Sequence, residues 1–114
     1  ENIEKDFRKW AENYPEVKII KENSSDAAEK IDRRIRFDYV YIDASHEYLQ
    51  VKKDIEAWWS RVKYGGILAG HDYCSQGRHK DVKKAVDEFR KWKNVKLFYT
   101  STSSYPSWFM IKDK

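Results

Sequence analysis

Two short polar segments of this 114-residue chain carry the side chains best suited to chemistry. The first runs from Asp43 to His46, and the second is His71 followed by Asp72. An unperturbed imidazole titrates near pH 6.5, so a histidine can accept a proton at neutral pH. Carboxylates and imidazoles together form an oxygen and nitrogen ligand set that suits Mg²⁺ or Mn²⁺ and could accept Fe or Zn. The residue types therefore predict an acid–base site, a metal site, or both.

Each of these residues also has a purely structural interpretation. Asp43 can cap the helix that follows it, and Asp72 can cap a turn further along the chain. His46 fits an exposed loop, and His71 can form a hydrogen bond at the margin of a sheet. Each segment directly follows a strongly apolar run, however, and this coincidence at two strand ends favours a functional site.

The first third of the chain predicts a helix, a strand and a second helix. Helical spacing of apolar residues over residues 3–14 is followed by a β-rich run at residues 17–21. Ser25 or Asp26 can cap the next helix, with Glu29 placed as in a capping box. Its apolar side carries Ala28, Ile31 and Ile35.

The central part of the chain predicts a βαβ unit. Residues 37–42 are nearly continuously apolar or aromatic, which suits a parallel strand buried on both faces. A helical period follows, and a tight turn at Gly65 and Gly66 leads into a strand over residues 67–70. The inward positions of this helix are Val51, Ile55, Trp58 or Trp59, and Val62.

The last part of the chain predicts one more helix and two strands. Val82, Val86 and Phe89 mark the helix, and residues 95–98 mark a strand. Pro106 separates that strand from residues 108–111, which are close enough to return antiparallel.

The alternation of helices and strands favours a three-layer α/β sandwich with right-handed parallel connections. In such open sheets, ligands bind outside the carboxyl ends of the strands. The strands at residues 37–42 and 67–70 are consecutive in a βαβ unit, so we expect them to be neighbours. Their following segments would then bring two Asp and two His side chains into one crevice.

Composition excludes several classes of function. The net charge is only +4, with Lys and Arg dispersed along the sequence, which argues against nucleic-acid binding. One cysteine cannot form an internal disulfide, and no apolar stretch approaches the roughly 20 residues that cross a membrane, so we expect a cytoplasmic protein. The sequence also lacks a zinc-type cysteine set, a Walker phosphate loop and a G-x-S-x-G elbow.

Three blocks of the sequence resemble a known family. They are residues 37–48 (FDYVYIDASHEY), 65–73 (GGILAGHDY) and 82–89 (VKKAVDEF). In order and spacing they resemble class I S-adenosylmethionine-dependent methyltransferases of the group that includes bacterial sugar and macrolide O-methyltransferases. The resemblance covers nearly the whole chain and implies a Rossmann-like sheet that is mostly parallel, with an antiparallel last strand.

The resemblance also implies roles for residues at the two strand ends. Metal-dependent members of the family bind a divalent ion through acids at these ends, which makes Asp43 and Asp72 candidate ligands. His71 occupies a position that is often acidic in those members, and it is included as a third candidate ligand. A histidine three residues after the first acid serves as general base in some members, which makes His46 the candidate base.

Cofactor-binding residues follow from the resemblance in the same way. Ser24 and Ser25 correspond to the segment that lines the adenine side of S-adenosylmethionine. Asp43 and Ala44 correspond to positions near the methyl donor.

The family's first two strands, with the glycine-rich cofactor loop, have no counterpart in this sequence. We therefore expect residues 1–114 to form a single truncated methyltransferase-like domain that binds S-adenosylmethionine weakly or not at all by itself. The chain opens on Glu1 within an apparent helix, and its one methionine is Met110, so we expect a further amino-terminal segment.

The missing strands carry a prediction about the sheet. The strand at residues 17–21 must either pair directly with residues 37–42 or leave that strand with an open edge. The expected outcomes are a sheet in which the family's third, fourth, fifth, seventh and sixth strands follow one another, or a homodimer that covers the gap.

The function expected from the residues and the resemblance is O-methyl transfer to a small molecule such as a sugar, with His46 as base. The alternative is a non-catalytic α/β module that acts through self-association or partner binding. Titration with S-adenosylmethionine separates the two, because such a module should not bind the cofactor.

Overall fold

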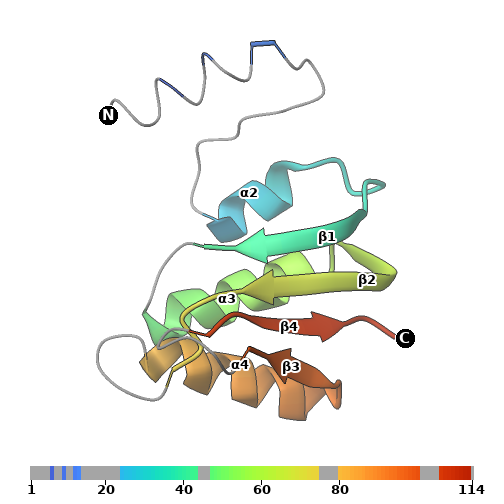
Figure 1. Ribbon diagram of the computed structural model, residues 1–114. Coiled ribbons are helices and arrows are strands. Elements are labelled where there is room, and N and C mark those ends of the chain that lie inside the picture. The colour runs from blue at the N-terminus through green and yellow to red at the C-terminus, as the bar shows by residue number, and fades with distance from the viewer. Residues whose placement is uncertain are drawn as a thin grey trace.

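The computed structural model describes residues 6, 9, 12–13, 24–43, 47–74, 80–100 and 106–113 (Figure 1). The helices are α2 (Ser24–Lys30), α3 (Tyr48–Trp59) and α4 (Lys80–Lys93), and the strands are β1 (Phe37–Ile42), β2 (Val62–Gly70), β3 (Leu97–Tyr99) and β4 (Trp108–Ile111). None of the helices within these ranges is long and apolar enough to span a membrane.

The described strands form one mixed sheet in the order β1-β2-β4-β3. β1 and β2 are parallel, whereas β4 runs antiparallel to both β2 and β3. This confirms the predicted neighbours of the βαβ unit and the antiparallel last strand. The strand predicted at residues 17–21 lies outside the described residues, so its pairing with β1 stays a prediction.

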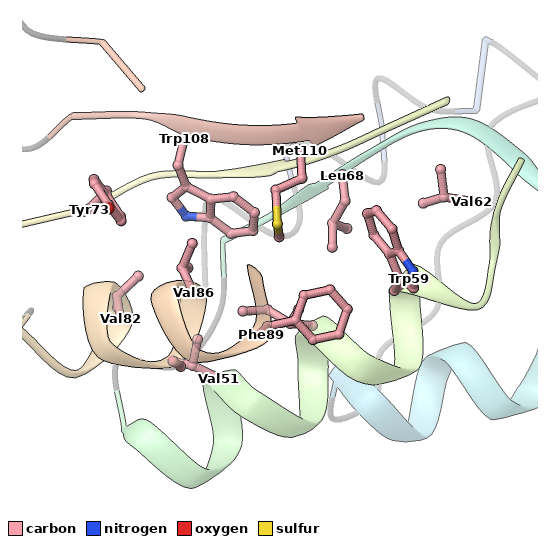
Figure 2. Close-up of a cluster of buried hydrophobic side chains, with 12 residues drawn as sticks. Val51, Trp59, Val62, Leu68, Tyr73, Val82, Val86, Phe89, Trp108 and Met110 are labelled. Carbon is pink, nitrogen blue, oxygen red and sulfur yellow. The ribbon is translucent and has the colours of Figure 1, made fainter. Parts of the chain in front are cut away.

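Helices α3 and α4 cover one face of the sheet, and the core lies between them and the strands (Figure 2). Ile55 of α3, Leu68 of β2, Val86 of α4 and Met110 of β4 are fully buried there. Helix α2 packs beside α3, where the Trp58 indole donates hydrogen bonds to Ser24. The described helices therefore form one layer, and the second helical layer of the expected three-layer sandwich is not confirmed.

Strand β1 is less buried than its composition predicts. Its side chains alternate, with Val40 and Ile42 packed against the core and Tyr39 and Tyr41 on the opposite face. The two tyrosines are 57% and 45% exposed. The prediction of a strand buried on both faces is wrong for the described structure, because the tyrosine face has no described helix over it.

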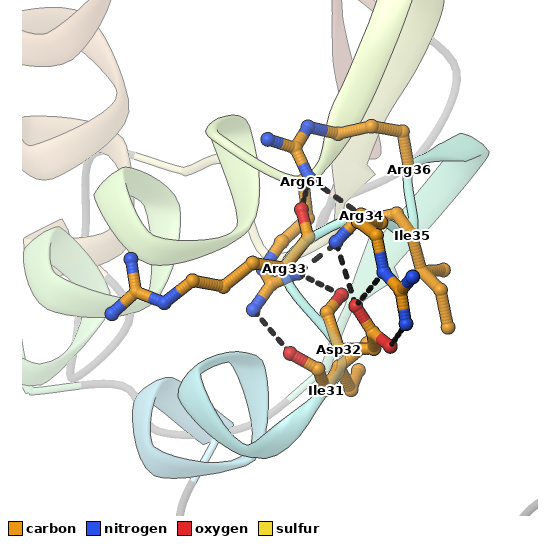
Figure 3. Close-up of polar contacts among 7 residues, drawn as sticks. All are labelled: Ile31, Asp32, Arg33, Arg34, Ile35, Arg36 and Arg61. Atoms are coloured by element: carbon orange, nitrogen blue, oxygen red, sulfur yellow. Dashed lines mark hydrogen bonds and ion pairs between the residues drawn. The ribbon is translucent and has the colours of Figure 1, made fainter.

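Helix α2 is shorter than predicted and begins earlier. It starts at Ser24 and ends at Lys30, and Ile35 is 45% exposed instead of lying on an apolar helix face. The buried guanidinium of Arg61 donates to the carbonyl oxygens of Ile31 and Asp32, at 2.6 and 2.7 Å (Figure 3). These bonds satisfy carbonyl groups just past the helix end, where the intrahelical ladder leaves acceptors without partners.

The junction between α3 and β2 also differs from the prediction. Helix α3 ends at Trp59, and Val62 begins β2 opposite Phe37 instead of continuing the helix. Gly65 and Gly66 lie inside β2, where the register with β1 shifts, and not in a turn before the strand. Gly65 has a φ of +87°, a conformation that favours glycine, so the pair forms an irregularity within the strand.

Replacing Gly66 by alanine should destabilise the fold more than replacing Gly65. An added Cβ at Gly66 would lie 2.7 Å from the Asp38 carbonyl oxygen and 2.9 Å from that of Lys63, and these backbone atoms cannot rotate away. We expect Gly66→Ala to lower the free energy of unfolding by about 2 kcal/mol. Gly65→Ala meets open space and carries only its backbone strain, which costs about 1 kcal/mol. Urea unfolding that ranks the two variants the other way would contradict this description of the irregularity at Gly65 and Gly66.

Candidate functional site

The carboxyl ends of β1 and β2 bring together three of the side chains singled out from the sequence. Ile42 and Gly70 are register partners, so the residues that follow them emerge at the same edge of the sheet. The Nε2 atom of His71 lies 3.0 Å from Asp43 Oδ1 and 3.0 Å from Asp72 Oδ2. We call this group the Asp43–His71–Asp72 cluster.

Tyr41 completes the contacts of the His71 ring. Its hydroxyl lies 2.8 Å from His71 Nδ1, on the side of the ring opposite the two carboxylates. With the proton on Nε2, the imidazole accepts from the tyrosine hydroxyl and donates to the carboxylates, so both ring nitrogens are satisfied. These contacts fix the orientation of His71 from two directions.

Sequence reasoning did not assign a role to Tyr41. A signal for it was nevertheless present, because side chains two residues apart in a strand project from the same face. Tyr41 therefore shares a face with Asp43, and its register partner Ala69 is two residues before His71.

Exposure decreases from one carboxylate of the cluster to the other. The side chains of Asp43, His71 and Asp72 are 62%, 30% and 13% exposed. The carboxylate of Asp43 is therefore largely exposed to solvent, whereas that of Asp72 is mostly buried. A ligand approaching this edge of the sheet would meet Asp43 first.

The backbone at Asp72 is held in a left-handed conformation, with φ of 62°. Outside glycine this region is uncommon, although aspartate tolerates it better than most residues. The next residue, Tyr73, anchors the segment: its N–H donates to the Pro106 carbonyl at 2.9 Å, and its hydroxyl donates to Asp87 Oδ1 at 2.6 Å. Burial and the Asp87 carboxylate raise the pKa of Tyr73, so this anchor keeps its proton at neutral pH.

Two predicted site residues, Ala44 and His46, lie outside the described residues. The roles assigned to them, near the methyl donor and as general base, stay predictions.

Ser24 and Ser25 make their described contacts with α3. The Trp58 indole donates to the Ser24 carbonyl and hydroxyl oxygens, at 3.0 and 2.8 Å. The amide of Gln50 donates to the Ser25 hydroxyl at 3.4 Å. The structure therefore ties both serines to the packing of α2 on α3, and their role in cofactor binding stays a prediction.

Asp54, beside these serines, makes the stability of the fold dependent on pH. Its carboxyl group is fully buried on α3, and Gln50 donates to one oxygen at 2.8 Å. Burial raises the pKa of Asp54 above its ordinary value of 3.8, against the opposing effect of hydrogen bonds from Gln50, Ser25 and Ser24. The folded protein thus binds this proton more tightly than the unfolded chain does.

The pKa of Asp54 is higher in the folded protein than in the unfolded chain. Its proton therefore stabilises the fold fully below pH 3.8, and this stabilisation is lost as the pH rises through the pKa of the folded state. Asparagine does not titrate, so Asp54→Asn should lose this pH-dependent contribution to stability. We expect the free energy of unfolding of the variant to fall less between pH 4 and pH 7 than that of the wild type does. Urea unfolding at both pH values measures the difference. Parallel pH profiles for the two proteins would show that Asp54 does not titrate as described.

The arrangement of the cluster does not support the expected divalent-ion site. Across the described ranges, no group of three or more His, Cys, Asp or Glu side chains is placed to hold a metal ion. In the cluster itself, His71 Nε2 lies within hydrogen-bond distance of both carboxylates. The roles of Asp43, His71 and Asp72 as metal ligands therefore stay a prediction.

Comparison with known proteins identifies the family. The family model for a methyltransferase domain matches residues 1–73, which is more than half of the chain. No curated protein matches the sequence.

Solved structures share the fold. A protein from Staphylococcus aureus, described as a caffeoyl-CoA O-methyltransferase, superposes with a TM-score of 0.70 at 17% identity and covers 96% of this chain. An O-methyltransferase from Bacillus cereus, solved in complex with SAH, superposes with a TM-score of 0.57 at 13% identity and covers 76% of this chain.

The chain spans only part of these two proteins, 59% of the first and 46% of the second. The fold of the described residues nevertheless agrees with the family match, which contains the first two of the three sequence blocks. The chain therefore belongs to the methyltransferase domain family, as a class I member.

Proposed function

We propose that this chain is part of an enzyme that transfers a methyl group from S-adenosylmethionine to a hydroxyl oxygen of a small molecule. The observation that supports the proposal is the meeting of Asp43, His71 and Asp72 at the carboxyl ends of two adjacent parallel strands, where open α/β sheets bind ligands. The SAH bound to the related Bacillus cereus protein supports the choice of methyl donor.

When bound, S-adenosylmethionine supplies an activated methyl group on its sulfonium sulfur. Transfer is a direct displacement in which the acceptor oxygen gains a bond to the methyl carbon as the sulfur loses one. The protein then has two tasks, to align the acceptor and to remove its proton. We assign proton removal to His46, which follows the exposed Asp43 by three residues.

The cluster aligns the acceptor in this proposal. The exposed carboxylate of Asp43 accepts a hydrogen bond from a hydroxyl of the acceptor, and the His71 N–H holds that carboxylate in place. Asp72, nearly buried and fixed through Tyr73, supports His71 from below. Ser24, Ser25, Asp43 and Ala44 remain the proposed contacts to the cofactor.

A polyhydroxylated acceptor such as a sugar fits a site lined by carboxylates, because its hydroxyl groups are hydrogen-bond donors. The related Staphylococcus aureus protein is described as a caffeoyl-CoA O-methyltransferase, so a phenolic acceptor is the natural comparison.

Self-association is a further proposal, because large apolar side chains such as Leu49 and Trp92 are 70% and 65% exposed.

We expect the methyl transfer to proceed without an added divalent ion. Across the described residues, no group of three or more His, Cys, Asp or Glu side chains is placed to hold a metal ion. An excess of EDTA should therefore leave the rate of methyl transfer nearly unchanged. Complete loss of activity in EDTA, with recovery on adding Mg²⁺ or Mn²⁺, would mean that the cluster rearranges to bind a metal.

To test the proposed activity, a full-length protein that contains this chain is incubated with S-adenosylmethionine that is labelled in its methyl group. Transfer of the label to a sugar or a phenolic acceptor, but not to an aliphatic thiol, is the expected result. A protein that binds neither S-adenosylmethionine nor SAH, measured by calorimetry, would instead favour the non-catalytic module.

A further inference from the structure

The edge of the sheet opposite the Asp43–His71–Asp72 cluster carries a cavity lined by positive charges. Its volume is about 630 Å³, within the range of small-molecule sites. Four cationic side chains line it, and none of its lining residues is acidic; the four are Arg36, Lys63, Lys93 and Lys112.

The topology explains why residues so distant in sequence meet here. Arg36 directly precedes β1 and Lys63 is the second residue of β2, at the starts of two parallel strands. Lys112 directly follows β4, which runs antiparallel to β2, and Lys93 is the last residue of α4. Two strand starts, one strand end and one helix end therefore bring four cations to a single edge.

Lys112 is the most constrained of the four. Its ammonium group donates to the carbonyl oxygens of Trp59 and Val62, at 2.7 and 3.0 Å. It also lies over the rings of Trp59 and Tyr64, 5.6 and 5.2 Å from their centroids. Burial lowers the pKa of Lys112, and the charges of Arg36 and Lys93 lower it further. The neighbouring cations thus repel one another, and none of the residues that line the cavity is acidic.

The contacts of the other three cations leave them able to bind an anion. Lys63 pairs with Asp38 at 3.4 Å, but their side chains are 53% and 86% exposed, so the pair is weak. Lys93 lies over the Trp92 ring. Arg36 extends away from the Asp32–Arg34 ion pair, and its described contacts are with backbone carbonyl groups (Figure 3).

We propose that this cavity binds a small organic polyphosphate, with the phosphate groups on the four cations. Arg and Lys donate charge-assisted hydrogen bonds to phosphate oxygens, and several negative charges on one ligand would relieve the repulsion among the cations. The Tyr64 ring, 73% exposed at the cavity wall, offers a stacking surface for a flat ring attached to the phosphates. A nucleoside triphosphate carries both features, whereas inorganic tripolyphosphate carries only the charge.

The test is calorimetric titration of the protein with ATP and, separately, with inorganic tripolyphosphate at low ionic strength. Both should bind, with ATP the tighter of the two. Arg36→Gln combined with Lys93→Gln should lower the affinity for both ligands roughly tenfold, because two exposed charge pairs with the phosphates are lost. Tyr64→Ala should lower the affinity for ATP but not that for tripolyphosphate.

A matched control removes the same amount of charge elsewhere. Lys53 on α3 and Lys80 at the start of α4 are exposed and do not line the cavity. Lys53→Gln with Lys80→Gln should leave both affinities within about twofold. Equal weakening by the control would mean that binding follows only the net charge of +4, and the proposal would be wrong. It would be wrong too if a short single-stranded oligonucleotide bound while neither ATP nor tripolyphosphate did.

Discussion

His46→Ala, in a full-length protein that carries this chain, is expected to lower kcat roughly 100-fold while the affinity for S-adenosylmethionine stays nearly unchanged. The reason is that alanine cannot take the proton of the acceptor hydroxyl, whereas it removes no group that we assign to cofactor binding. Added imidazole should restore part of the rate by supplying a diffusible base.

The sequence provides a control for this variant in His79, a histidine to which we assign no role. His79→Ala should keep the wild-type rate. The pH profile gives a second readout, because the wild-type kcat should rise with a pKa near that of histidine and His46→Ala should lose this step. Unchanged turnover in His46→Ala would remove His46 from the mechanism.

The second large effect is expected at His71. His71→Ala removes the Nε2 atom that lies 3.0 Å from an oxygen of each carboxylate, and it leaves Asp43 free to turn towards solvent. Because small displacements of a positioning group are costly, we expect kcat to fall roughly 30-fold. The free energy of unfolding should fall by less than about 1 kcal/mol, since the His71 ring is partly exposed.

Tyr41→Phe is the matched control, because it removes only the hydroxyl that contacts His71 Nδ1 and leaves the contacts to the carboxylates. Its rate should stay within about threefold of the wild type. If His71→Ala instead lost stability as steeply as activity, or retained full activity, His71 would be a structural residue and not a positioning one.

The positions of the two strand ends could be predicted because their signals are local. The apolar run over residues 37–42 is the observed strand β1, and polar residues follow both β1 and β2. The rule that parallel neighbours end at one edge was then enough to bring Asp43, His71 and Asp72 together.

The errors in the predicted elements arose where distant contacts decide local structure. Val62 fits the helical period of α3, but the chain leaves the helix at Trp59 and pairs Val62 with Phe37. The apolar side of α2 was expected to reach Ile35, but carbonyl groups just past Lys30 bind the guanidinium of Arg61 instead. A short window of sequence contains neither Phe37 nor Arg61 as a partner.

The cationic cavity shows the same limit for charge. Along the sequence, Arg36, Lys63, Lys93 and Lys112 are separated by about 20 to 30 residues and look like dispersed surface charges. They meet only because the strand directions bring their ends to one edge. The pattern of charges along the sequence therefore could not predict that these four cations line one cavity.

The most direct test of the central claim is an NMR titration of the isotope-labelled full-length protein with SAH. The claim predicts that the amide resonances of residues 42–48 and 70–73, at the carboxyl ends of β1 and β2, shift the most. Resonances at the opposite edge, near Lys63 and Lys112, should stay in place. Shifts confined to that opposite edge, or to the exposed face of α4, would contradict the assignment of the methyl-transfer site to these two strand ends.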